Sequence, residues 1–229
     1  GPNGGMLWTP ATAGGGSATV RRSAEQMNVI SALLHEGDVF WDIGAHHGSV
    51  TLFGSRRVGP KGHVHAFEPS GMNRWFLERH VRWNGLKNVT IQPYALSNFD
   101  GEAKFGGSGA STGFALNEGG ETVQVRTMRA LISQGIQLPT FVKVDVQNAE
   151  ADLLRGGLEA LRPDTRLLIS IHSRESNTAC SELLRKAGFS LVESRDMATM
   201  AHGDADLAAF GPGYSSTAKD RERLQAVGF

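Results

Sequence analysis

The chain has little cysteine, few aromatic residues and no excess of either charge. It contains one cysteine among 229 residues, and aromatic side chains make up 7% of it. A lone Cys180 excludes an internal disulfide framework and favours a reducing compartment, so we expect a cytoplasmic protein. The 23 basic and 23 acidic residues give a formal net charge of zero, and no block of like charge stands out. A nucleic-acid partner is therefore not expected.

Long apolar runs are also missing. No stretch approaches the roughly 18–20 apolar residues needed to cross a bilayer, and no secretory signal is visible. The length suits one α/β domain with a substantial core rather than two domains. We therefore assign residues 1–20 to a protease-cleavage scar and a flexible lead-in, and residues 21–229 to a single domain.

Glycine, in contrast, is abundant, with 29 residues, and one group of glycines is informative. The apolar run Val39–Ile43, which contains Asp42, leads into a Gly-x-x-x-Gly turn and then into an amphipathic pattern. That order predicts a buried strand, a tight loop and a helix. The loop, called the glycine loop below, is Gly44-Ala45-His46-His47-Gly48.

A second predicted strand, His63–Phe67, ends at Glu68, twenty residues after Gly48. Glycines allow a backbone to approach a ligand closely, and a carboxylate after the next strand can accept hydrogen bonds from both hydroxyls of a ribose. The two features together predict a site for a nucleoside cofactor. A nicotinamide-dependent oxidoreductase also needs them, but this loop lacks the Gly-x-Gly-x-x-Gly spacing that seats a pyrophosphate.

Strands and helices alternate along the rest of the chain, which predicts a mostly parallel sheet with helices on both faces. Further strands are expected at 89–91, 122–126, 141–146 and 166–171, and helices at 70–84, 128–134 and 149–161, with one more ending at Gly188. A helix capped by Ser23 precedes the first strand, and residues 189–192 and 207–210 form an antiparallel hairpin. Trp75 and Trp83 have helical spacing and are expected to pack their helix against the sheet.

Polar residues follow two of these strands. Asp145 lies at the carboxyl end of the predicted strand 141–146 and His172 at that of the strand 166–171, and ligands dock at this edge of open α/β sheets. Asp145 can orient a cofactor, an acceptor hydroxyl or a metal. His172, with an ordinary pKa of about 6.5, suits a general base, although a rim histidine bonded to water is an alternative. The pair can contribute to a divalent-metal site, but no third ligand is evident, so a metal is not favoured.

Five separated motifs follow one another along the chain: Asp42–Gly48, Phe67-Glu68-Pro69, Asn84–Val89, Ala95-Leu96-Ser97 and Val142–Glu150. In their order and spacing they resemble one family, the FkbM-type S-adenosylmethionine-dependent methyltransferases. The resemblance implies an α/β, class I (Rossmann-like) methyltransferase fold with a mostly parallel seven-stranded sheet and a C-terminal antiparallel hairpin. It also implies methylation of a hydroxyl on a sugar or another small molecule by direct transfer from S-adenosylmethionine.

The resemblance also implies roles for individual residues. Asp42 orders the glycine loop or receives the cofactor's ammonium. The methionine part is expected at Gly44, Ala45, His46 and Gly48, the ribose at Glu68 beside Pro69, and the adenine edge at Ala95, Leu96 and Ser97. The adjacent side chains of His46 and His47 are expected to point in different directions. Asp145 serves the cofactor or, with His172, catalysis.

The chain departs from the family at Gln147 and Asn148, where Glu-Gly is usual. Asn is the best replacement for glycine at positive φ, so the backbone shape is expected to survive. The lost carboxylate leaves a second interpretation open, a methyltransferase fold that only binds or scaffolds. The sequence identifies neither the acceptor nor the oligomeric state. Residues 98–120 and the tail after Met200 are expected to shape the acceptor pocket.

Overall fold

The computed structural model describes residues 5–7, 26–106, 115–116, 120–194, 205–215 and 218–229. Most of the expected lead-in and the predicted Ser23 cap lie outside these residues. Residues 26–33 are helical. The remaining elements are β1 (Val39–Ile43), α2 (Ser49–Val58), β2 (His63–Phe67), α3 (Gly71–Trp83), β3 (Val89–Gln92), β4 (Tyr94–Leu96), β5 (Gly101–Gly106), β6 (Ala115–Leu116), β7 (Glu121–Arg126), α4 (Met128–Ser133), β8 (Phe141–Val144), α5 (Glu150–Arg155), η1 (Leu158–Ala160), β9 (Arg166–Ile171), α6 (Arg174–Lys186), β10 (Ser190–Glu193), β11 (Ala205–Phe210) and α7 (Ala218–Ala226).

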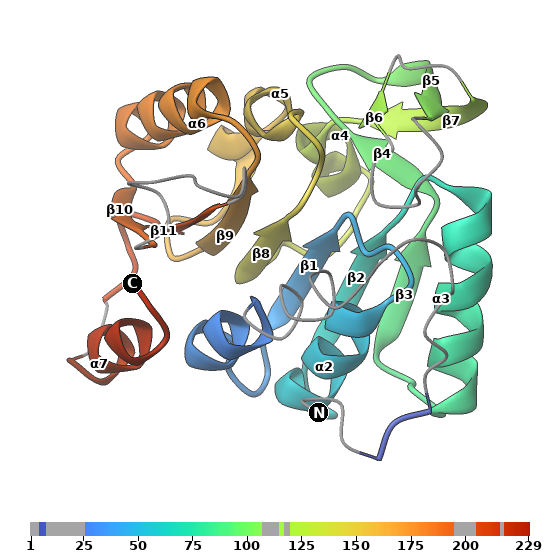
Figure 1. The fold of residues 1–229 in the computed structure, drawn as a ribbon, viewed down its shortest axis with the longest axis horizontal. Coiled ribbons are helices and arrows are strands. Elements are labelled where there is room, and N and C mark those ends of the chain that lie inside the picture. Colours follow the sequence, from blue (N-terminus) through green and yellow to red (C-terminus); the bar gives the residue numbers. More distant parts are fainter. Residues whose placement is uncertain (1–4, 8–25, 107–114, 117–119, 195–204, 216–217) are drawn as a thin grey trace.

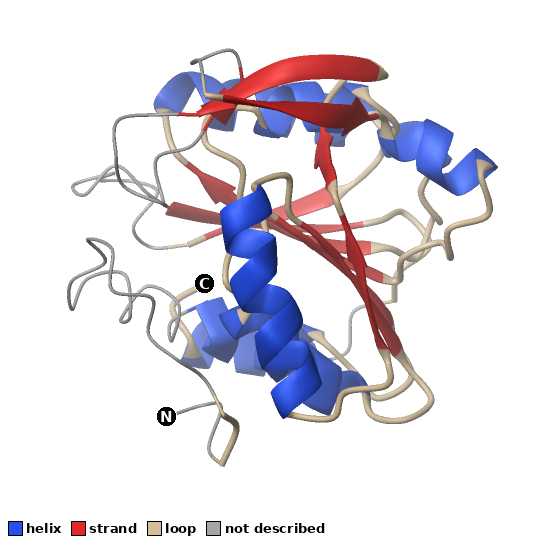
Figure 2. Cartoon of the chain, turned by 90° about the vertical axis from the view of Figure 1, so that its right-hand side faces the viewer, coloured by secondary structure: helices blue, strands red, loops and turns tan. Residues whose placement is uncertain are grey.

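The main sheet has seven strands in the order β10-β11-β9-β8-β1-β2-β3 (Figure 1). The pairs from β9 to β3 are parallel, whereas β11 is antiparallel to both β9 and β10. The predicted parallel sheet and C-terminal hairpin are thus confirmed. A second sheet, β4-β7-β5-β6, was not predicted and forms a separate layer (Figure 2).

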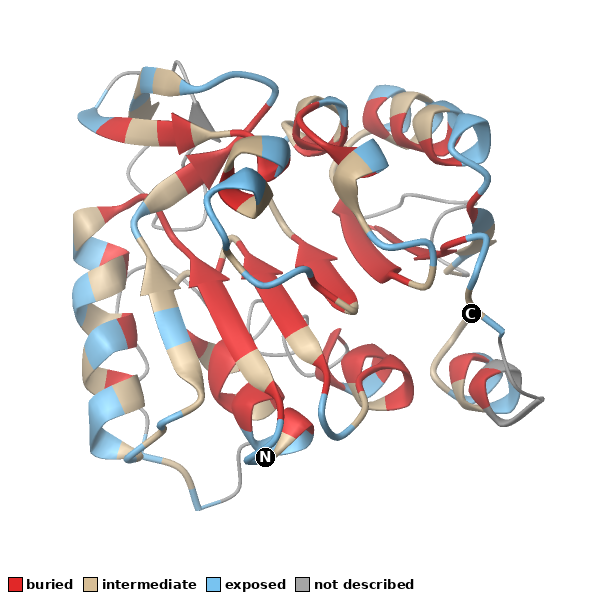
Figure 3. Ribbon diagram, turned by 180° about the vertical axis from the view of Figure 1, so that it is seen from behind, coloured by how far each residue is buried: buried red, intermediate tan, exposed pale blue. Residues whose placement is uncertain are grey.

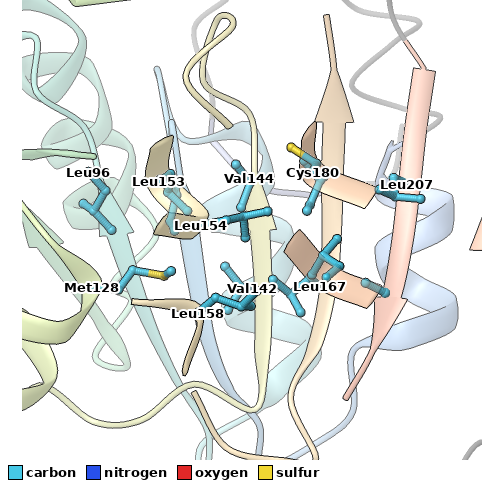
Figure 4. Packing of buried hydrophobic residues seen from close by; sticks show 14 of the residues in the cluster. Leu96, Met128, Val142, Val144, Leu153, Leu154, Leu158, Leu167, Cys180 and Leu207 are labelled. Carbon is cyan, nitrogen blue, oxygen red and sulfur yellow. The ribbon is translucent and has the colours of Figure 1, made fainter. Parts of the chain in front are cut away.

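Helices cover both faces of the main sheet because successive strand residues point to opposite sides. On one face Val142, Val144 and Leu167 pack under α4, α5 and α6 (Figure 4). On the other, Phe40 and Phe141 pack under the helix at 26–33, α2 and α7. The central strands are consequently buried along almost their whole length (Figure 3). Cys180 lies fully buried in the first of these cores, as an ordinary helix residue.

Two expectations about the helices were wrong. The side chains of Trp75 and Trp83 are 47% and 44% exposed, because α3 turns Leu77 and His80 toward the sheet instead. The helix expected at 149–161 is interrupted after Arg155. A Cβ at Gly156 would lie 2.0 Å from the Ser97 carbonyl oxygen, so this glycine permits the close approach at which α5 ends.

Candidate functional site

The predicted site residues meet at the carboxyl edge of the main sheet. β1 leads into the glycine loop, β8 into Asp145 and β9 into His172, and these three strands run parallel as neighbours. The carboxyl ends of parallel strands lie at one edge, so residues more than a hundred positions apart become adjacent. The structure thereby brings together Asp42, Asp145 and His172.

A buried lysine that the sequence analysis did not single out lies at the centre of this edge. Lys143 is the register partner of Asp42 across β1 and β8, so their side chains share a face. Its Nζ lies 3.2 Å from Asp42 Oδ1 and 3.7 Å from Asp145 Oδ2, and it donates to the Gly44 carbonyl oxygen at 2.9 Å. Burial would lower the lysine pKa, but the Asp42 and Asp145 carboxylates outweigh it and raise that pKa. Lys143 is therefore a fixed cation.

Asp42 is fully buried and faces protein on both oxygens. Thr51 donates its hydroxyl to Oδ2 at 2.6 Å, and Lys143 lies beside Oδ1. The carboxylate therefore ties the strand to the first turn of α2 and to the loop carbonyls. This geometry supports the loop-ordering role rather than direct contact with a ligand.

Close packing around the loop explains why glycine occupies two of its positions. Gly44 has φ +77°, and a Cβ there would lie 2.0 Å from the Asp145 carbonyl oxygen. Gly48 has φ +90°, and its Cβ would meet Leu77 Cδ1 at 2.3 Å. Both positions require a left-handed backbone with no side chain, which lets the loop close against β8 and α3. His46, between them, also has positive φ, at 52°.

Glu68 connects the glycine loop with the start of α3. Its carboxylate accepts from the backbone N–H of His46 at 2.8 Å, from that of Ser70 at 3.0 Å and from the Asn73 amide at 3.2 Å. The side chain is buried, which raises its pKa against the opposing effect of these donors. An ionised carboxylate has about four acceptor positions, so capacity for one further donor remains.

His172 is enclosed by two carboxylates. Its Nδ1 lies 2.5 Å from Glu150 Oε1, and its Nε2 lies 3.4 Å from Asp145 Oδ1. Burial lowers the imidazole pKa, but the hydrogen bonds and charges of Asp145 and Glu150 outweigh it and raise the pKa to about 10. The two carboxylates therefore favour the imidazolium, which has no lone pair to accept a proton, and this geometry argues against a general-base role for His172.

Glu150 is fully buried and holds His172 in place. Besides His172, it accepts from the Ser176 hydroxyl at 2.6 Å and from the Asn148 backbone N–H at 3.2 Å. Asn148 has φ 59°, so the expected left-handed backbone is present at this position. The Gln147 amide nitrogen lies 3.1 Å from His172 Nε2, and rotating the amide would present its carbonyl oxygen to that nitrogen instead.

Asp145 is the accessible carboxylate of the cluster, with a side chain that is 28% exposed. Desolvation would raise its pKa, but Lys143 and then His172 outweigh it and hold the pKa well below its ordinary value. Gln26, from the helix at 26–33, donates to Asp145 Oδ2 at 3.2 Å and to the Ser170 hydroxyl at 2.7 Å. Ser170 donates in turn to Asp206 on β11 at 3.1 Å. A polar row thus crosses four neighbouring strands.

His46 and His47 do not point apart as expected. Their ring centroids are 3.8 Å apart, and the His47 ring lies 4.9 Å from that of Phe76 on α3. The left-handed backbone at His46 turns consecutive side chains toward the same side, which strand-like alternation does not allow for. His80 also contacts the loop, with its Nδ1 2.7 Å from the His47 carbonyl oxygen.

The three residues assigned to adenine lie after the main sheet. Ala95 and Leu96 are in β4, which pairs with β7 in the second sheet, and both are buried in apolar clusters. Ser97 is also buried, and its backbone N–H donates to the Arg126 carbonyl oxygen at 3.1 Å. Among the described residues, no group of three His, Cys, Asp or Glu side chains is arranged to hold a metal ion.

A seven-stranded sheet with one antiparallel hairpin, a glycine loop after β1, and acidic residues within β1 and directly after β2 and β8 define a class I S-adenosylmethionine-dependent methyltransferase. The family model for the methyltransferase FkbM domain matches residues 42–191. The chain belongs to this family and is an S-adenosylmethionine-dependent O-methyltransferase, so the nicotinamide-dependent oxidoreductase interpretation is set aside. The chain is also 29% identical over 180 residues to hexuronic acid methyltransferase AglP from Haloferax volcanii, covering 75% of this chain and 72% of that protein.

Solved structures support the same fold. Fibrillarin from Aeropyrum pernix, solved with S-adenosyl-L-methionine, superposes with a TM-score of 0.55 at 16% identity, over 82% of this chain and 76% of that one. An O-methyltransferase from Bacillus cereus in complex with SAH gives a TM-score of 0.52 at 12% identity, over 88% and 84%. In the part of the chain that the structure describes, no helix is both long and apolar enough to cross a membrane.

Proposed function

We propose that this methyltransferase acts on an oxygen of a saccharide, and that a hexuronic acid is the first acceptor to test. The relative named as a hexuronic acid methyltransferase carries this proposal, because the match covers most of both chains. The accessible Asp145 beside the glycine loop supports it by marking where an acceptor can meet the cofactor. Cys180 is a free, buried cysteine, and its reduced state supports a cytoplasmic location for the protein.

Within this proposal the cofactor lies along the glycine loop and across the carboxyl ends of β1, β2 and β8. Glu68 accepts from a ribose hydroxyl through its one remaining acceptor position, with Pro69 beside it. Gly44, Ala45, His46 and Gly48 line the methionine part, and Ala95, Leu96 and Ser97 form the wall for adenine. Asp42 and Lys143 act beneath the loop by fixing its shape.

The chain's own contribution to the reaction is positioning. S-adenosylmethionine supplies an electrophilic methyl group, and the protein must hold the acceptor oxygen in line with it. Asp145 is fixed by Lys143, Gln26 and His172 from three sides, so it offers an acceptor one well-defined hydrogen-bond partner. Such fixed geometry lowers the barrier without any group moving during transfer.

Calorimetric titration with S-adenosylmethionine and S-adenosylhomocysteine tests the cofactor site. We expect micromolar binding to the unaltered chain and a loss of about tenfold or more in Glu68→Gln, since hydrogen bonds to charged groups contribute about 1.5–3 kcal/mol. Glu78→Gln, on the exposed face of α3, is the matched control and should bind normally. Circular dichroism separates lost affinity from lost folding. Unchanged affinity in a folded Glu68→Gln variant would remove the ribose assignment.

A further inference from the structure

We propose that α3 docks this protein on an anionic membrane surface, with the helix lying flat among the lipid headgroups. The surface involved, called the α3 stripe below, consists of Met72, Trp75, Phe76 and Trp83. The exposure of these side chains and the basic residues around them carry the inference. It goes beyond the proposed function and does not depend on which acceptor is methylated.

The stripe follows from the spacing of residues along α3, which lies at the side of the molecule beside the edge strand β3 (Figure 1). At 3.6 residues per turn, the four residues of the stripe and Arg79 fall on one face of the helix. Asn73, Leu77 and His80 fall on another face and are buried. Because that buried face already packs α3 on its domain, the apolar side chains of the stripe are not needed for the fold.

The stripe is also unusually exposed. The exposed fractions of Met72, Trp75 and Trp83 are 66%, 47% and 44%, and these three are half of the large hydrophobic side chains exposed in the described part of the chain. Leu7, another of them, adjoins the end of α3, because its backbone N–H and carbonyl oxygen each bond the Asn84 side chain at 2.8 Å. Exposed apolar side chains that gather in this way mark an interaction site, whereas scattered ones need no explanation.

Basic residues surround the stripe. Residues 49–90 contain seven Lys or Arg side chains and two Asp or Glu, although the whole chain balances 23 against 23. One of these two acids, Glu68, is buried at the glycine loop. Arg82 and Lys87 are exposed, and the Arg79 guanidinium carbon lies 3.3 Å from the centre of the Trp75 ring. This part of the surface therefore attracts a negatively charged partner.

The charges also distinguish between partners. A symmetric dimer would place the stripe of one copy on that of the other, so Arg79 and Arg82 would face like charges. A saccharide would stack on an open aromatic ring, but Arg79 already covers one face of Trp75. An anionic lipid surface suits both properties, because its headgroups attract the arginines while Met72 and the indole rings enter the interface, where Trp is favoured.

The stripe is continuous with the glycine loop. The Phe76 ring lies 4.9 Å from that of His47, which lies 3.8 Å from that of His46. The thirteen residues of α3 extend about 20 Å, which is shorter than the roughly 30 Å of a bilayer's hydrocarbon core. The helix therefore lies on the membrane rather than across it, with the glycine loop close to the lipid surface.

Vesicle flotation of the full chain tests this inference. The vesicles contain phosphatidylcholine alone, or phosphatidylcholine and phosphatidylglycerol in equal amounts. We expect binding to the anionic vesicles about tenfold or more tighter than to the neutral ones, weakened by high salt. Equal binding to both kinds of vesicle, or binding to neither, would overturn the proposal.

A double variant of the tryptophans locates the apolar contact. Trp75→Ser/Trp83→Ser should weaken binding to anionic vesicles about tenfold or more, since two large apolar side chains no longer enter the interface. Phe99→Ser/Leu138→Ser removes two exposed apolar side chains outside α3 and should bind normally. Equal effects of the two double variants would contradict the proposed contact.

A double variant of the arginines tests the charge contact. Arg79→Gln/Arg82→Gln should lose most of the preference for anionic vesicles, whereas Arg185→Gln/Lys186→Gln, in the last turn of α6, should keep it. Circular dichroism and calorimetry with S-adenosylmethionine show whether each variant is folded. A preference that both double variants retain would refute the charge contact.

Size-exclusion chromatography and binding of polyuridylic acid test the other occupants. A dimer that Trp75→Ser/Trp83→Ser converts to a monomer would assign the stripe to a second copy and overturn membrane docking. Binding of polyuridylic acid without binding of vesicles would assign it to a nucleic acid. Cofactor affinity and methyl transfer to a soluble acceptor should be unchanged in the stripe variants, so failure of this proposal leaves the proposed function standing.

Discussion

Replacement of Lys143 by Met tests the electrostatic centre of the site. Met has a similar length and is apolar, so it fills the space but leaves the Asp42 and Asp145 carboxylates without their shared cation. Removing one partner of a buried ion pair costs about 3–5 kcal/mol, because the remaining charge stays buried and uncompensated. Asp42 is fully buried whereas Asp145 is 28% exposed, so most of this cost arises at Asp42.

Urea denaturation followed by circular dichroism measures this change. We expect Lys143→Met to lower the free energy of unfolding by about 3–5 kcal/mol at pH 7, with an unchanged m-value. The double variant Asp42→Asn/Lys143→Met should recover about half of the loss, since the amide oxygen can still accept from Thr51.

The pH dependence of the free energy of unfolding provides a second test of the ion cluster. In the unaltered protein the depressed pKa of Asp145 contributes stability above its unfolded value of 3.8, and that contribution is lost as the pH falls through the folded value. Without Lys143 the Asp145 carboxylate loses the cation that lowers its pKa and takes up a proton more readily. The deficit of Lys143→Met should therefore shrink between pH 7 and pH 5. A loss below about 1 kcal/mol at pH 7, or a deficit that grows on acidification, would refute the ion-cluster account.

Three further predictions concern positions outside this ion cluster. Burial lowers the pKa of His65 to about 4, so the unfolded protein binds a proton at this residue more readily than the folded protein does. The free energy of unfolding should therefore fall by about 3 kcal/mol from pH 7 to pH 4. Thermal melts of His65→Leu should lack this part of the pH dependence. Asn148→Gly should leave the unfolding free energy nearly unchanged, whereas Asn148→Ala should lower it by about 1 kcal/mol because of the positive φ, and equal values would contradict this. Gly44→Ala should cost about 2 kcal/mol more than Gly85→Ala, since both have positive φ but only Gly44 would clash; similar melting points would argue against the tight loop.

Most of the main sheet could be predicted because its strands are largely apolar segments with turn-forming or polar residues at their ends. β1, β2 and β9 are apolar runs bounded by turns or polar residues, and their limits match the structure. The second sheet could not be found in this way. β4 has only three residues and β6 only two, so neither carries a readable alternation, and β4 pairs with β7 across a long stretch of sequence. Such pairing depends on tertiary contacts rather than local pattern.

The site residues could be located from sequence, but their protonation could not. Asp145 and His172 were expected at the carboxyl edge because each follows a predicted strand. The role of Lys143 depends on its register with Asp42, which only the pairing of β1 with β8 reveals. The sequence predicts an ordinary pKa for His172, because nothing in it indicates that Glu150, the first residue of α5, contacts the imidazole. Charge states are set by neighbours that lie far apart in sequence.

The backbone at Asn148 links these observations. Its left-handed conformation turns the chain between the end of β8 and the start of α5, and its N–H donates to Glu150. That turn places Asp145 before it and Glu150 after it on opposite nitrogens of His172. A residue unable to adopt positive φ would move Glu150 away, and His172 would then titrate nearer its ordinary range. The imidazole of His172 therefore lies between two carboxylates that this turn alone brings to its opposite nitrogens.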